Sequence, residues 1–79
     1  MSESRLKWQC RRGMRELDIL LESYLSLGYP RATDAHKHAF CELLALADPE
    51  LAGYLLGNLT PGDATLASLV SDIRNRTYA

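Results

Sequence analysis

The chain has 79 residues, 47% of them hydrophobic and 24% charged, which supports one small hydrophobic core and excludes disorder along its whole length. Residues 1–15 carry five basic residues and one acid, whereas residues 16–79 carry four basic residues and nine acids. A basic end joined to an acidic body suits the orientation of one partner protein, and it argues against a nucleic-acid-binding surface.

The expected elements in the first half of the chain are helices. A short helix is expected over about Glu3 to Gln9. Gly28, with proline two residues later, is expected to end the following helix in a left-handed cap. That second helix is predicted by apolar residues three and four positions apart, namely Met14, Leu17, Leu20, Leu21 and Tyr24.

Three further helices are expected in the second half. Asp48 and Pro49 predict a helix start, with Asp48 as the N-cap, and Asp63 is expected near the start of the last helix. The sequence therefore predicts an all-α, five-helix bundle that forms a single domain over residues 1–79. The apolar stripes of these helices are His36, Phe40, Leu43, Leu44 and Ala47; then Leu51, Tyr54 and Leu55; then Leu66, Leu69, Val70 and Ile73.

The histidines and cysteines do not predict a metal or catalytic site. His36 and His38 are two residues apart, whereas a metal-binding pair on a helix needs four, so we expect His36 to border the core and His38 to be solvated. Cys10 and Cys41 are isolated, with no Cys-x-x-Cys spacing. A buried thiol is the favoured interpretation of Cys10, and the less favoured alternative is a nucleophile whose pKa is lowered by Arg11 and Arg12. With no recognisable signal peptide or membrane-length apolar run, we expect a reduced, cytoplasmic protein without membrane insertion.

The segment of residues 11–16, Arg-Arg-Gly-Met-Arg-Glu, is unusual for the start of a helix. Arg11 and Arg15 are like charges four residues apart, and basic side chains there oppose the helix dipole. Gly13 costs about 1 kcal/mol relative to alanine inside a helix, but it allows another backbone to approach closely. We therefore interpret residues 11–16, called the contact segment below, as a surface for binding another protein.

The alternative for the contact segment is an ordinary solvated helix start. In that case Arg12 and Glu16 form a four-residue-spaced ion pair worth about 0.3 kcal/mol. Trp8, the only tryptophan, is expected to anchor the first helix to the core. Its alternative is exposure in an interface, because tryptophan and arginine dominate binding hot spots.

The stretch from Trp8 to Asp18 resembles the signature of the FAD assembly factors, the flavinylation factors of succinate dehydrogenase and fumarate reductase. Their Arg-Gly-x-x-Glu motif is matched by Arg12, Gly13 and Glu16. The sequence departs from that family at Tyr54, where tryptophan is expected, and at Ala35-His36, where relatives are more acidic. Further matches are Phe40-Cys41-Glu42-Leu43-Leu44, Asp48-Pro49-Glu50-Leu51 and Tyr54-Leu55.

The resemblance implies a five-helix monomer that binds the flavoprotein subunit and promotes covalent attachment of FAD to one of that subunit's histidines. It implies no catalytic residue in this chain and no stably bound cofactor, because FAD is handled on that flavoprotein subunit, called the client below. The spacing of the histidines and cysteines agrees with this, since it predicts neither a metal site nor a reacting group. The alternative function is a small adaptor or antitoxin-like interaction module that uses the same basic end.

The predicted roles divide the contact segment. Gly13 gives close approach to the client, and Arg12 and Arg15 donate to client carbonyls or carboxylates. Glu16 orients Arg12 or accepts from a client base, while Met14 faces the core. The predicted partner-binding residues are Arg12, Gly13, Arg15 and Glu16, followed by Arg11 and Trp8.

Overall fold

The computed structural model describes the backbone of residues 3–77 and the side chains of residues 5–75. Within that part of the chain there are five α-helices and one 3-10 turn, which confirms the predicted all-α fold. The predicted domain, residues 1–79, extends past the described residues at both ends. The helices are α1 Glu3–Gln9, α2 Arg15–Leu27, the 3-10 turn η1 Tyr29–Arg31, α3 Asp34–Leu44, α4 Asp48–Leu55 and α5 Ala64–Thr77.

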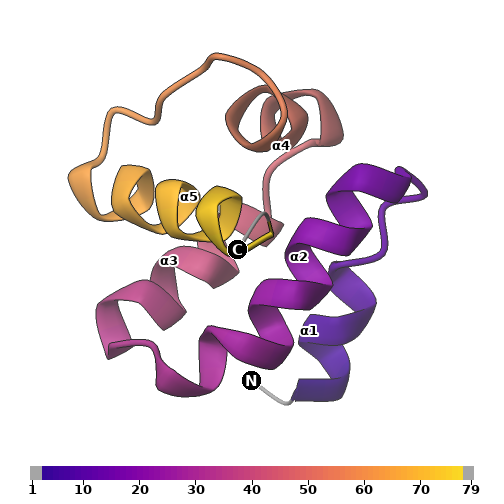
Figure 1. The fold of residues 1–79 in the computed structure, drawn as a ribbon, viewed down its shortest axis with the longest axis vertical. Coiled ribbons are helices and arrows are strands. Elements are labelled where there is room, and N and C mark those ends of the chain that lie inside the picture. Colours follow the sequence, from indigo (N-terminus) through magenta and orange to yellow (C-terminus); the bar gives the residue numbers. More distant parts are fainter. Residues whose placement is uncertain (1–2, 78–79) are drawn as a thin grey trace.

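The last helix closes the core, because α5 packs on both α2 and α3 (Figure 1). The first two helices pack together on one side of the molecule, and α4 contacts both α2 and α5. The predicted apolar stripes supply most of the buried side chains, since a helix in a small domain is stabilised mainly by burying one face. These are Leu17, Leu20, Leu21 and Tyr24 of α2, Phe40, Leu43 and Leu44 of α3, Leu51 and Leu55 of α4, and Leu69, Val70 and Ile73 of α5.

An aromatic cluster joins the end of α2, η1 and α3. The ring of Phe40 is fully buried, and its centroid lies 5.0 Å from that of Tyr24 and 5.6 Å from that of Tyr29. Both pairs are tilted, as the charge distribution of aromatic rings favours. The ammonium of Lys37 lies 5.4 Å from the centre of the Tyr29 ring. The cluster therefore fixes the turn between α2 and α3.

Side chains cap the starts of α3 and α5. Thr33 Oγ1 accepts a hydrogen bond from the backbone N–H of His36 at 3.2 Å. Asp63 Oδ2 accepts one from the backbone N–H of Leu66 at 2.9 Å. Each cap satisfies an N–H group that has no acceptor within its own helix. The second cap confirms the predicted start of the last helix.

Two helix boundaries differ from the prediction. Gly28 has φ −103° and ψ −42°, so it is not a left-handed cap; the chain runs directly into η1 instead of turning away. Ala47 is the N-cap of α4 and Asp48 is its first residue. The carboxylate of Asp48 accepts a hydrogen bond from Arg12 Nη1.

Candidate partner-binding surface

The first part of the contact segment is a loop and not a helical turn. α1 ends at Gln9, and α2 begins only at Arg15. Gly13 lies between them with φ +79°, in the left-handed region that side-chain-bearing residues rarely adopt. Met14, the N-cap of α2, is extended with φ −114° and ψ 109°. Glycine is therefore required by the turn of the backbone, and the helix penalty expected from the sequence does not apply.

The loop changes the expected charge pairs. Because α2 begins at Arg15, Arg11 lies outside the helix and the predicted repulsion between the two arginines along one helix is wrong. Arg11 Nε instead lies 3.5 Å from Glu22 Oε1 on α2. Both side chains are well exposed, so this ion pair contributes little to stability.

Arg12 is held through both its backbone and its side chain. Its backbone N–H donates to Asp18 Oδ1 at 2.7 Å. Its guanidinium crosses to the connection between α3 and α4, where Nη2 donates to the carbonyl of Leu44. Nη1 donates to the carbonyl of Leu46 and to Asp48 Oδ1, at 3.3 Å each. No spacing pattern in the sequence indicates this contact, because the partners of the guanidinium are 32 to 36 positions away.

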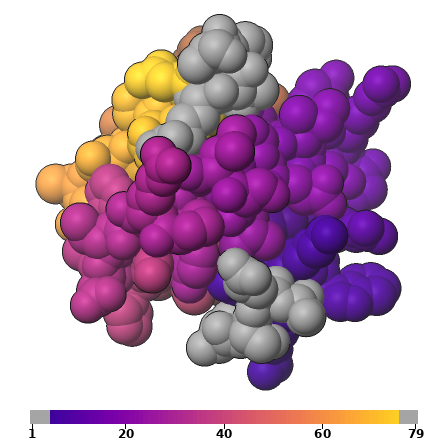
Figure 2. All heavy atoms as spheres, turned by 60° about the horizontal axis from the view of Figure 1, so that its bottom comes forward, coloured from indigo at the N-terminus to yellow at the C-terminus, as the bar shows by residue number. Residues whose placement is uncertain are grey.

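The remaining motif residues are open to solvent. Gly13, Arg15 and Glu16 are all exposed. A Cβ placed on Gly13 would meet no atom within 4 Å, so the outer side of the loop has room for another molecule. Side chains of the N-terminal part of the chain, indigo to purple, also stand out from one edge of the molecule (Figure 2). The structure thus brings Arg12 inward and leaves its neighbours in the motif outward.

Trp8 lies on the outer side of α1 with 75% of its surface exposed, so the expectation that it anchors this helix is wrong. Leu6 and Cys10, spaced by one helical turn, fill that inner position and are fully buried. Met14 was also expected in the core but is 37% exposed, because it precedes α2 in extended backbone. The exposed surface next to the motif is therefore more apolar than the sequence predicted.

The thiol of Cys10 is buried, and its surroundings disfavour the thiolate. Burial raises the pKa of its thiol from 9.0 to about 11, and the charges of Glu22 and Asp18 act in the same direction. Arg12 lowers that pKa by a smaller amount than burial raises it. A thiol that remains protonated at neutral pH reacts slowly, which argues against the alternative of an arginine-activated cysteine.

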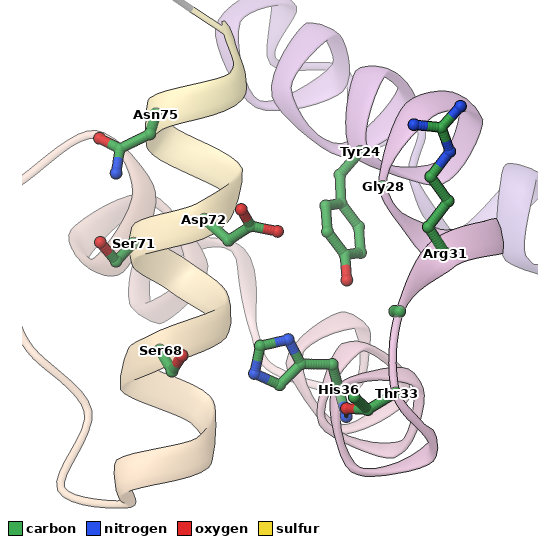
Figure 3. Close-up of a pocket in the computed structure, with 10 residues that line it drawn as sticks. Tyr24, Gly28, Arg31, Thr33, His36, Ser68, Ser71, Asp72 and Asn75 are labelled. Atoms are coloured by element: carbon green, nitrogen blue, oxygen red, sulfur yellow. Dashed lines mark hydrogen bonds between the residues drawn. The ribbon is translucent and has the colours of Figure 1, made fainter.

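A hollow of about 470 Å³ lies at the opposite end of α2 from the contact segment. It is lined by the C-terminal end of α2, the N-terminal end of α3 and one side of α5. Tyr24, His36 and Asp72 face one another across it (Figure 3). None of the predicted partner-binding residues lines it. His36 is half-buried and His38 exposed, as predicted. Within the described residues, no group of three or more His, Cys, Asp or Glu side chains is placed to hold a metal ion, and no helix is long and apolar enough to cross a membrane.

Fold and surface together define a small helical protein that displays an Arg-Gly-x-x-Glu loop, held on its inner side and open on its outer side. Residues 4–77 match the family described as the flavinator of succinate dehydrogenase, and the chain belongs to that family. This membership confirms the resemblance seen in the sequence.

Relatives named FAD assembly factor SdhE cover nearly the whole chain. The protein of Photorhabdus laumondii is 40% identical over 75 residues, which are 95% of this chain and 85% of the relative. That of Legionella pneumophila is 44% identical over 73 residues, 92% of this chain and 91% of the relative. That of Yersinia pseudotuberculosis is 38% identical over 78 residues, 99% of this chain and 89% of the relative.

Proposed function

We propose that this protein is an assembly factor that binds the flavoprotein subunit of succinate dehydrogenase or fumarate reductase. It promotes the covalent attachment of FAD to a histidine of that subunit. The observation that carries the proposal is membership of the flavinator family over residues 4–77. The names of the relatives, FAD assembly factors, support the same role.

The chemistry is assigned to the client and its cofactor. The new bond joins the 8α-methyl carbon of the flavin to the client imidazole, and neither group belongs to this chain. A helper without a reacting group accelerates such a step by holding the imidazole and the flavin in reactive geometry. The protonated, buried thiol of Cys10 fits a helper without catalytic residues. FAD stays on the client, and no cofactor binds this chain stably.

The outward residues of the contact segment carry the contact. Within the described residues, Arg15 and Glu16 form no hydrogen bond or ion pair through their side chains. Arg15 therefore has donors to offer to a client carboxylate, and Glu16 can accept from a client base. Gly13 admits close approach of the client backbone, and exposed Trp8 adds a large apolar surface beside it.

The charge distribution bears on the kind of partner. The basic end of the chain faces an acidic region of one partner protein, and nucleic acid is not a ligand. We propose further that the protein acts as a monomer in the cytoplasm.

Purified apo flavoprotein subunit, FAD and a dicarboxylate, with and without this protein, provide the test. Covalent flavin is followed by in-gel fluorescence after denaturation. We expect faster labelling with the protein, loss of that effect with Glu16→Ala, and no loss with Glu42→Ala, which removes an exposed acid from α3. Equal labelling with and without the protein, from a client that flavinylates slowly alone, would favour the adaptor alternative.

A further inference from the structure

We propose that Asp48, at the start of α4, is a positioning residue that acts through Arg12 to hold the contact segment in its binding shape. The inference rests on the proposed function, because it concerns the surface that the client would contact. It assigns a role in client binding to a residue that lies outside the contact segment. It also divides the motif into an inner part that sets the geometry and an outer part that makes the contact.

The first step of the argument is the environment of the Arg12 guanidinium. Its side chain is only 17% exposed, and three acceptors surround it: the carbonyls of Leu44 and Leu46 and the carboxylate of Asp48. Nε is also buried and has no hydrogen-bond partner in the described structure. Because this guanidinium is largely buried and three of its five N–H donors are already used within the chain, we expect Arg12 to contribute to binding through the loop it holds.

The second step is the charge balance at the end of α3. A helix leaves its last carbonyls without internal donors, and they carry partial negative charge that favours a cation. α3 has no basic residue in its own last turn, so Arg12 supplies the cation from a distant part of the chain. The carbonyls of Leu44 and Leu46 are neutral groups, however, and among the three acceptors only Asp48 supplies a full negative charge. Asp48 therefore sets how firmly the guanidinium is held.

The third step connects this tie to the binding surface. Arg12 is fixed at its backbone by Asp18 and at its side chain by Asp48. The next residue, Gly13, makes the left-handed turn, and α2 begins two residues later at Arg15. Displacing Arg12 consequently moves the glycine turn and the first residues of α2, which are the exposed part of the contact segment.

The test compares Asp48→Ala with Glu50→Ala. Both remove an acid from the first turn of α4, so both lose the same interaction with the helix dipole, but only Asp48 pairs with Arg12. We expect Asp48→Ala to weaken client binding about tenfold and to shift the amide resonances of Gly13 and Arg15 in the free protein. Glu50→Ala should change neither the affinity nor those two resonances. Affinity is measured well below the melting temperature of each variant, so that loss of folded protein does not contribute.

A double-variant comparison separates positioning from direct contact. If Asp48 acts through Arg12, Asp48→Ala should have no further effect on client affinity in an Arg12→Ala background. Additive losses, or unchanged affinity in Asp48→Ala alone, would overturn the inference. If the wild-type protein does not bind the client, the proposed function fails. The amide shifts of Gly13 then still decide whether Asp48 shapes the loop, and unchanged shifts would refute that part independently.

Discussion

Replacing Gly13 by alanine tests whether the turn before α2 needs glycine for its backbone conformation. A Cβ at this position meets no atom within 4 Å, so crowding contributes nothing to the cost. The left-handed backbone costs a side-chain-bearing residue about 1–2 kcal/mol. Alanine also restricts the unfolded chain, which offsets about 0.4–1 kcal/mol of that cost. We therefore expect Gly13→Ala to lower the free energy of unfolding by about 1 kcal/mol, or the melting temperature by about 4–8 °C.

The assay is urea unfolding followed by circular dichroism at 222 nm. Gly62→Ala is the matched control, because Gly62 is also exposed and has open space around a new Cβ, but its φ is not positive. It should be neutral or slightly stabilising. Gly13→Asn should lose less stability than Gly13→Ala, since asparagine tolerates the left-handed region. If Gly13→Ala is as stable as the wild type, or Gly62→Ala loses as much, the conformational argument is wrong.

Three further outcomes follow from burial and ionisation. The pKa of the Cys10 thiol is 9.0 in the unfolded chain and is raised to about 11 in the folded one. The contribution of this thiol to the free energy of unfolding should therefore be fully present below pH 9. Between pH 9 and pH 11 the free energy of unfolding should fall by up to about 1.4 kcal/mol per pH unit. Cys10→Ala should lack this component, and identical pH profiles of the two proteins would contradict it. Trp8→Ala should change the free energy of unfolding by less than about 0.5 kcal/mol but weaken client binding about tenfold; the opposite pattern in thermal melts and binding titrations would assign Trp8 to the core. Phe40→Ala should cost about 3–5 kcal/mol in denaturant unfolding, and a variant as stable as the wild type would disprove its central place between Tyr24 and Tyr29.

The helices were predictable because each has an apolar stripe that repeats along its own length. Leu17, Leu20 and Leu21 illustrate this, since their spacing alone places them on one buried face of α2. The position of Asp63 near the start of α5 was predictable because the helix dipole favours an anion there, and in the structure this carboxylate caps the helix. Both signals are local, and both were confirmed.

The geometry of the contact segment was not predictable from local signals. The predicted apolar stripe includes Met14, but the positive φ of Gly13 and the extended backbone of Met14 show that the helix begins later. The direction of Arg12 depends on Asp48, 36 positions away, and no spacing rule relates two such residues. The exposure of Trp8 depends on which face of α1 packs against α2. Leu6 and Cys10 are the side chains buried on that inner face, and Trp8 lies on the outer face.

The tie between Arg12 and the connection of α3 with α4 also has a thermodynamic consequence. We expect a chain in which that connection has opened to lose the single shape of the contact segment, so that a client bound at the proposed surface would select the closed form. Binding then stabilises the closed form by mass action. Amides near Leu44 and Leu46, which lie outside the contact segment, should exchange hydrogen more slowly when the client is bound. Client affinity would then depend on the connection between α3 and α4 as well as on the contact segment itself.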